Sequence, residues 1–281
     1  SFLATLSSKI NKAKLFIDLR DTFSDNYIYF YRWKKRALLA GIFLLLENYI
    51  FSSAYSINIV SLGFKEAFYG WEKILKKNHI TLTNFTNAIS KDFKQLIKEA
   101  TNNINRKNNF YKVVYAGNIG AGQDLLSLIN SLSSNKTLLK KMIEEKIVFY
   151  IYGSGAQLKI IKKIIDSDNS NLLNKFIFYK GLLPRDQISK VYSNADCLMI
   201  NLGRYSSLSL VIPSKIFEYA ATPYPILFSA KGYTYDFIKN VNGTISYELE
   251  NPLSFYNALK KSKKLKINSS KRELFLDQFD S

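Results

Sequence analysis

Short apolar segments alternate with longer amphipathic ones along this chain, and that alternation restricts the folds open to it. The longer segments have a helical pattern, and the short ones are rich in β-branched and aromatic residues. Alternation of this kind is typical of parallel sheets covered by helices. The sequence therefore predicts an α/β fold, with strands at 14–19, 56–61, 79–83, 112–116, 147–151, 176–179, 197–201 and 225–228.

Two domains are predicted, since 281 residues are enough for two cores. The boundary is placed in the polar, asparagine-rich segment 101–109, which has too few apolar residues to form a core. Residues 106–281 contain about five strand–helix units, which is typical of a doubly wound, Rossmann-like domain. Residues 1–105 are predicted to form the other domain, also a parallel sheet covered by helices, together with the linker.

The chain has one cysteine, Cys197, and one histidine, His79. A zinc cluster of cysteine and histidine ligands needs three or four such residues, and a disulfide framework needs pairs. No metal site is therefore expected. His79 is interpreted as a partly buried strand residue, and the low cysteine content favours a reducing compartment, the cytoplasm.

The net charge is +18, from 40 basic and 22 acidic residues. Such a charge favours anionic partners, namely nucleotide-sugars, nucleic acid or an acidic membrane surface. The alternative is a general bias toward Lys, Asn and Ile. Aromatic residues do not interleave with basic ones on an evident platform, so nucleic acid is not an expected partner.

The longest apolar run is Ala37–Leu46. It is too short to span a membrane, which takes roughly 20 apolar residues. A core helix is the favoured interpretation, and a helix on the inner membrane surface is the alternative. Residues 1–13 lead directly into a predicted strand and do not have a signal-peptide pattern.

Glycine-containing turns follow three successive strands of the second domain. In doubly wound sheets, ligands bind beyond the carboxyl ends of the strands. Glycine lets the backbone approach a phosphate or a sugar closely. Each turn alone is equally explained as a tight connection, but three on one edge predict a binding site formed by Gly117, Asn118, Gly120, Gly153, Gly155, Gly181 and Leu182.

The segment 212–221 is the strongest single feature. Pro213 and Ser214 are residue types favoured at a helix start, where free amides attract anions. Lys215 adds a full positive charge, and Glu218 lies one turn beyond Ser214 on the same side. This spacing suits a diphosphate at the helix start and a ribose at Glu218. The alternative is a capped helix with a solvated lysine.

The order of these motifs resembles family 4 glycosyltransferases of the GT-B architecture, which has two Rossmann-like domains. The Pro-Ser-Lys-x-x-Glu-Tyr version is similar to enzymes that build bacterial surface polysaccharides. The resemblance covers most of the chain from Leu15 to about Phe255. It is carried in the second domain by 115–120, 152–155, 181–184, 192–196, 212–219 and 225–226, and in the first by 18–21 and 61–64.

The resemblance implies that the second domain binds a nucleotide-sugar and that Glu218 holds the nucleotide ribose. Glu218 matches the second acid of the family's Glu-x-x-x-x-x-x-x-Glu motif, whereas Leu210 stands at the position of the first. Segment 121–123 lacks the family's basic cluster. The glycine-rich loop of the first strand is absent, so the chain is expected to begin midway through the amino-terminal domain.

The predicted function is a retaining glycosyltransferase of the hexosyltransferase type, acting in surface polysaccharide (lipopolysaccharide) synthesis. Ser214 and Lys215 would stabilise the departing diphosphate, without cofactor or metal. The acceptor would be a saccharide or a lipid-linked saccharide, with Arg20 and Asp21 near it or forming only a structural ion pair. The alternatives are a truncated, non-catalytic nucleotide-sugar-binding module, a nucleotide-sugar epimerase and a nucleic-acid binder.

Overall fold

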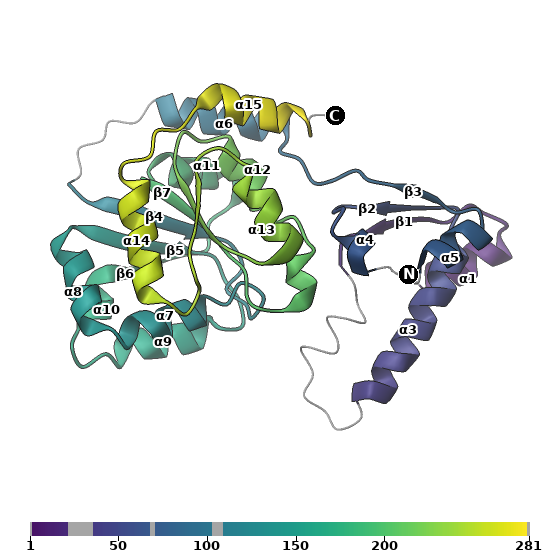
Figure 1. The fold of residues 1–281 in the computed structure, drawn as a ribbon, viewed down its shortest axis with the longest axis horizontal. Coiled ribbons are helices and arrows are strands. Elements are labelled where there is room, and N and C mark those ends of the chain that lie inside the picture. Colours follow the sequence, from purple (N-terminus) through teal and green to yellow (C-terminus); the bar gives the residue numbers. More distant parts are fainter. Residues whose placement is uncertain (1, 22–35, 68–70, 103–108, 280–281) are drawn as a thin grey trace. The chain divides into compact units, whose positions relative to one another are not determined.

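A computed structural model describes residues 2–21, 36–67, 71–102 and 109–279 of the chain. The chain divides into two compact units, each with its own parallel sheet (Figure 1). The first unit takes residues within 1–87 together with 205–213 and 232–234. The second takes 88–204, 214–231 and 235–281. The predicted α/β class with two Rossmann-like units is therefore confirmed.

The first unit has a three-stranded parallel sheet in the order β1-β2-β3, formed by Phe16–Leu19, Ser56–Ile59 and Thr81–Thr83. Alternate residues of β2, Ile57 and Ile59, are fully buried. They pack in an apolar cluster with Ile50, Phe51 and Phe64. The helices of this unit are α1 (Phe2–Ile10), α3 (Arg36–Ser52), α4 (Phe64–Ala67) and α5 (Trp71–Lys77).

Helix α3 corrects one interpretation of the sequence. From residue 41 onward, where the side chains of α3 are described, the buried ones are those of Ile50 and Phe51 in the last turn, and these enter the core. Ile42, Leu44 and Leu45 are exposed, with Leu45 at 71%. The middle of the apolar run is thus not the core helix that was expected. The amino-terminal part of the predicted helix, 27–35, lies outside the described residues.

One element and one side chain of the first unit differ from the sequence analysis. Residues 2–10 form helix α1, for which no element was predicted. The interpretation of His79 as a partly buried strand residue is wrong. His79 is exposed and lies in the turn before β3, with φ of 53°. Left-handed backbone of this kind belongs to a turn and not to a strand, so His79 has no place in the sheet.

The second unit has a six-stranded parallel sheet in the order β6-β5-β4-β7-β8-β9. The chain moves outward from β4 in one direction and then returns to β7 on its other side. This is the strand order of the doubly wound dinucleotide-binding fold, which places its crevice where the order reverses. The strands are Tyr111–Ala116, Ile147–Tyr152, Ile177–Gly181, Cys197–Asn201, Ile226–Ser229 and Thr244–Ser246.

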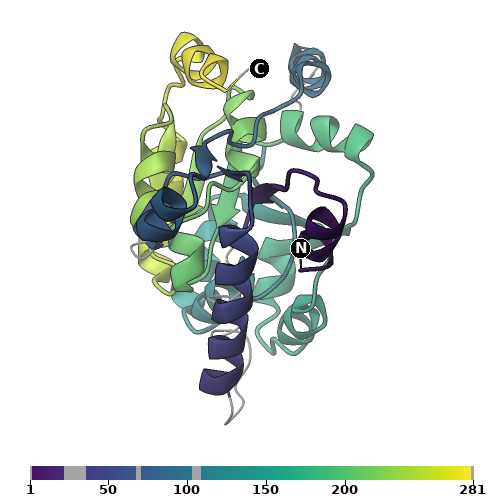
Figure 2. The ribbon, with the colours of Figure 1, turned by 90° about the vertical axis from the view of Figure 1, so that its right-hand side faces the viewer.

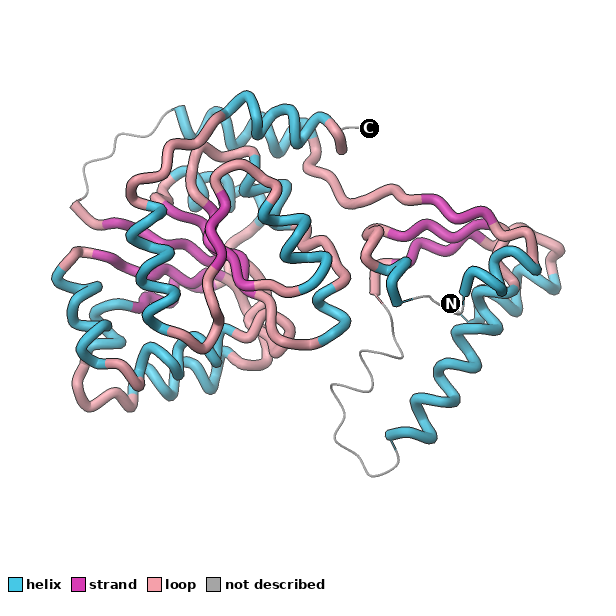
Figure 3. Tube along the Cα trace, in the orientation of Figure 1, coloured by secondary structure: helices cyan, strands magenta, loops and turns pink. Residues whose placement is uncertain are grey.

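Helices lie on both faces of this sheet, as the ribbon and the tube views show (Figures 2 and 3). Side chains cap several of them: Asp124 accepts from the amide of Ser127 at α7, and Asn251 accepts from that of Ser254 at α14. Along the chain between these strands come α7 (Leu125–Ser133), α8 (Lys136–Glu144), α9 (Leu158–Asp166), α10 (Leu172–Phe176), α11 (Arg185–Ser193), α12 (Lys215–Ala220) and α13 (Gly232–Lys239). The 3-10 turn η1 (Ser206–Ser209) also falls in this stretch but belongs to the first unit. Helices α6 (Lys91–Asn102), α14 (Pro252–Ser262) and α15 (Ser269–Asp277) flank the series.

The division between the units falls at Asn87 and not at residue 105. Helix α6 belongs to the second unit because its buried residues Phe93 and Ile97 face that unit. The ring of Phe93 packs edge-on against Tyr192 of α11, with centroids 6.4 Å apart. Two further elements of this unit were not predicted from the sequence: strand β9, which has three residues, and helix α15.

Candidate functional site

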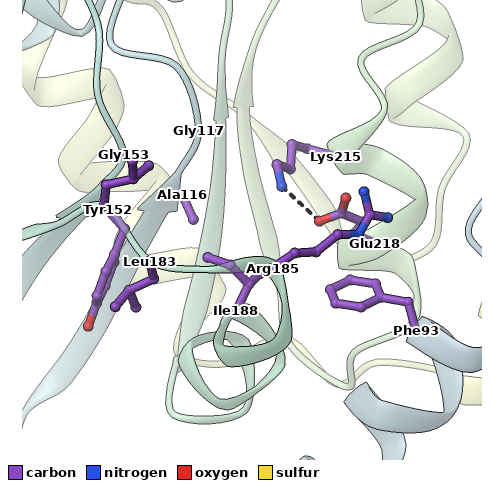
Figure 4. Close-up of a pocket in the computed structure, with 11 residues that line it drawn as sticks. Phe93, Ala116, Gly117, Tyr152, Gly153, Leu183, Arg185, Ile188, Lys215 and Glu218 are labelled. Carbon is purple, nitrogen blue, oxygen red and sulfur yellow. Dashed lines mark hydrogen bonds and ion pairs between the residues drawn. The ribbon is translucent and has the colours of Figure 1, made fainter.

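A cavity of about 280 Å³ opens beyond the carboxyl ends of β4, β5 and β6, where the turns that follow these strands meet α11 and α12 (Figure 4). This is the edge of the sheet at which the glycine turns predicted a ligand. Five of the predicted site residues line it: Gly117, Gly153, Leu182, Lys215 and Glu218. No role was predicted for the other lining residues, Phe93, Ala116, Tyr152, Leu183, Arg185 and Ile188.

Three polar side chains meet on one side of this cavity. The ammonium group of Lys215 lies 2.8 Å from Oε2 of Glu218 and 2.9 Å from the hydroxyl of Tyr192. The Tyr192 hydroxyl donates to the same carboxylate oxygen at 2.6 Å. The Glu218 side chain is 12% exposed and that of Lys215 33%, so both are partly screened from water. A cation and an acceptor for hydroxyl groups thus stand side by side, within reach of a ligand.

Tyr192 is fully buried and fixes the position of this group. Its ring packs edge-on against Tyr219, with centroids 5.1 Å apart, as well as against Phe93. Burial is the main reason why the pKa of Tyr192 lies well above its usual value, and the charges of Tyr219 and Glu218 add to it. The hydroxyl therefore stays protonated and remains a hydrogen-bond donor to Glu218.

The glycine turns after β4 and β5 pack directly on each other. Gly153 has φ of 129°, and a Cβ atom there would collide with the carbonyl oxygen of Gly117. The amide of Ile119 donates to the carbonyl of Ser154 at 2.7 Å. A Cβ on Gly155 would meet the carbonyl of Ile119. Close packing of two turns therefore accounts for Gly153 and Gly155, while Gly117 and Gly153 also form part of the cavity wall.

Five predicted site residues do not line the cavity: Asn118, Gly120, Gly155, Gly181 and Ser214. Asn118 is exposed and donates to the side chain of Gln123 at 3.0 Å. Gly120 is buried, and its carbonyl accepts two amides within its own turn. Ser214 is exposed and makes no capping bond to α12.

A second cation at the cavity comes from Arg185, at the first position of α11. Its guanidinium lies over the ring of Phe93, 5.1 Å from the centroid, and Figure 4 shows both side chains beside Lys215 and Glu218. Arg185 was not predicted as a site residue because a charged side chain in the first turn of a helix is usually exposed to solvent. Phe93 was not predicted because that residue precedes the predicted domain boundary.

Leu210, which stands where the family motif has its first acid, belongs to the first unit. Its carbonyl accepts the hydroxyl of Ser61, and its side chain packs against the apolar cluster of that unit. Arg20 pairs with Asp18 at 2.8 Å on the same unit. Within the described part of the chain no three side chains of His, Cys, Asp or Glu are grouped as metal ligands.

No protein-family model and no curated protein sequence matches this chain. Solved structures match it over nearly its whole length. Trehalose 6-phosphate synthase from Burkholderia multivorans aligns with 99% of the chain at a TM-score of 0.69 and 9% identity. The fold is that of GT-B glycosyltransferases.

HepE from Anabaena, in complex with UDP and glucose, aligns with 98% of the chain at a TM-score of 0.64 and 11% identity. Sucrose-phosphate synthase from Thermosynechococcus elongatus aligns with 99% at a TM-score of 0.67 and 12% identity. The chain spans 66% of the trehalose 6-phosphate synthase, 69% of HepE and 67% of the sucrose-phosphate synthase. The resemblance in fold that the motifs implied is thereby confirmed.

Proposed function

We propose that this chain binds a nucleotide-sugar and transfers its glycosyl group with retention of configuration. The observation that carries the proposal is the pairing of Lys215 with Glu218 in a cavity beyond the carboxyl ends of β4, β5 and β6. A nucleoside diphosphate presents a double negative charge next to a ribose with two hydroxyls. A lysine and a carboxylate one helical turn apart are complementary to that pair.

Each part of the donor then has a partner. Lys215 and Arg185 contact the diphosphate, and Glu218 accepts the ribose hydroxyls. The backbone of Gly117 and Gly153 borders the space in which the phosphate and the sugar lie. As the glycosidic bond to the diphosphate breaks, negative charge develops on the leaving oxygen. Cations already in place stabilise that charge and lower the barrier, which is the main catalytic task we assign to Lys215.

UDP is the first nucleotide to test, because HepE was solved with UDP and glucose and again with UDP alone. The acceptor that we propose is a saccharide or a lipid-linked saccharide, in the synthesis of a surface polysaccharide such as lipopolysaccharide. This scheme requires neither a cofactor nor a metal. Ser214 does not line the cavity, so it would assist Lys215 only through its backbone.

Contact of the first unit with the inner face of the cytoplasmic membrane is part of the proposal. Exposed apolar side chains of α3, namely Ile42, Leu44 and Leu45, support it together with the net charge of +18. Among the described residues, no helix has the length and apolar content needed to cross a bilayer. Sedimentation with vesicles of anionic lipid tests this contact: Leu45→Glu is expected to reduce binding, and equal binding of both proteins would rule it out.

Thermal unfolding in the presence of UDP, GDP and CMP tests the donor site itself. At least one nucleoside diphosphate is expected to raise the melting temperature of the native chain, since a ligand that binds only the folded state stabilises it. CMP, which lacks the second phosphate, is expected to do so less. If no nucleotide stabilises the chain, the donor-site proposal fails.

A non-catalytic nucleotide-sugar-binding module is the second candidate, and Leu210 is the observation that favours it. A leucine cannot accept the hydrogen bonds that an acid at that position would offer to the donor sugar. Release of UDP from UDP-glucose, with and without an oligosaccharide acceptor, separates the candidates. Binding without release in either case would support the module, whereas acceptor-dependent release would support the transferase.

A further inference from the structure

Arg272 of helix α15 is a buried cation far along the chain from the donor cavity. The residue is 2% exposed. The guanidinium donates to the backbone carbonyls of Tyr219 at 2.9 Å, Thr222 at 3.5 Å and Tyr224 at 3.1 Å, and also to that of Asn242. Four directional bonds from one side chain thus converge on two short stretches of backbone.

Three of those carbonyls belong to the end of α12 and the turn that leads into β8. The last carbonyls of a helix have no partner within the helix and carry its partial negative charge. The carbonyl of Tyr219 also accepts the amide of Thr222 at 3.1 Å and its hydroxyl at 2.8 Å, so Arg272 adds a charged donor to a carbonyl that the turn already holds. A guanidinium matches both needs, since it is cationic and its donors point in several directions. Gly243 leaves room for it, because a Cβ there would lie 2.9 Å from Nη2 of Arg272.

Helix α15 holds the same short helix by a second set of contacts. The ring of Phe217, one residue before Glu218, stacks on Phe275 with centroids 5.9 Å apart. It also packs edge-on against Phe279 at 5.1 Å. Phe217 is 1% exposed, so this contact lies in the core between α12 and α15. Both the backbone and a core side chain of α12 are therefore fixed by α15.

Burial removes the guanidinium from water, which costs free energy and lowers the pKa of Arg272 to about 10. A well-packed apolar residue would stabilise the same place without this desolvation cost. What the apolar residue could not supply is a set of oriented donors. The position of Arg272 is thus better explained by the geometry that it imposes on α12 than by its contribution to packing.

We propose that Arg272 is a positioning residue for the donor site, an inference that rests on the proposed function. It holds the carbonyl of Tyr219, the residue next to Glu218, and so sets the direction in which the Glu218 carboxylate faces the ribose. The carboxy-terminal helix therefore acts on nucleotide affinity without touching the nucleotide.

A double-mutant cycle between Arg272 and Glu218 tests this inference. UDP affinity is measured by calorimetry for the native chain, Arg272→Lys, Glu218→Gln and the double variant, each well below its melting temperature. Arg272→Lys keeps the positive charge but loses the guanidinium N–H groups that donate to four carbonyls at once. We expect this change to weaken UDP binding about tenfold. In the Glu218→Gln background the same change is expected to matter less than about twofold. Lys271→Ala, an exposed neighbour on α15, is the control and should bind as the native chain does.

The outcomes separate the two proposals. If the native chain binds neither UDP nor GDP, the donor-site proposal fails and this inference falls with it. If the native chain binds UDP and folded Arg272→Lys binds it equally well, or if the loss is the same in both backgrounds, Arg272 is merely structural. Should Arg272→Lys not fold, Phe275→Leu replaces it in the cycle, since it loosens α15 while keeping Arg272, and the same coupling with Glu218 is expected.

Discussion

Lys215 and Glu218 form an ion pair of 2.8 Å on the wall of the cavity, one turn apart on helix α12. The hydroxyl of the buried Tyr192 contacts both partners: it donates to the Glu218 carboxylate and accepts from the Lys215 ammonium group. In the proposed function, an incoming diphosphate would compete with Glu218 for the lysine, and a ribose would compete with the lysine for Glu218. The two parts of a nucleotide would then separate a pair that is already in position.

Lys215→Ala is expected to weaken UDP binding by about tenfold or more, because a charge-assisted contact to phosphate is lost. Uridine, which has no phosphate, should bind the variant and the native chain equally. Calorimetry at low salt measures both affinities. Lys163→Ala, which removes an exposed lysine of α9, is the matched control and should leave UDP binding unchanged. Equal losses for UDP and uridine would show that Lys215 does not contact phosphate.

Glu218→Gln is expected to abolish discrimination between UDP and 2′-deoxy-UDP. In the proposed function the Glu218 carboxylate accepts the ribose hydroxyls, so loss of one hydroxyl should weaken binding to the native chain about tenfold. The neutral amide is a poorer acceptor, and the two nucleotides should bind the variant with similar affinity. Glu144→Gln changes an exposed acid of α8 in the same way and serves as control. A variant that still prefers UDP as strongly as the native chain does would remove Glu218 from the ribose site.

The sequence predicted the half of this site that lies within one helical turn. Lys215 and Glu218 are neighbours on any helix, so their spacing alone placed them together. Tyr192 contacts Glu218 from 26 residues away, a pairing that depends on how α11 packs on α12. Strand β7, Cys197–Asn201, was predicted at its observed bounds because it is buried on both faces. Helix α15 was missed since its buried face includes Arg272, a residue type usually found in solvent.

Gly153→Ala is expected to disrupt the cavity, whereas Gly181→Ala should be tolerated much better. Both glycines have positive φ, 129° and 89°. A Cβ on Gly153 would collide with the carbonyl of Gly117, while one on Gly181 would meet nothing within 4 Å. We expect a loss of unfolding free energy of about 3 kcal/mol or more for Gly153→Ala. Backbone strain alone should cost about 1–2 kcal/mol for Gly181→Ala. Urea unfolding compares the two, and similar losses would contradict the packing described for these turns.

Stability is expected to fall above pH 10, in part because Tyr192 is buried. Burial raises its pKa in the folded chain, so the unfolded chain loses this proton first as the pH increases. The stabilisation is fully present below the unfolded pKa of about 10 and is lost as the pH rises toward the folded value. Between pH 8 and pH 10.5 this one group should remove about 0.8 kcal/mol of unfolding free energy.

Tyr192→Phe should be less stable at pH 8, by about 1 kcal/mol, since Glu218 loses a hydrogen bond. It should then lose less stability than the native chain over the same pH range. Urea titrations at both pH values measure the difference, and identical losses in the two proteins would mean that Tyr192 ionises as readily folded as unfolded.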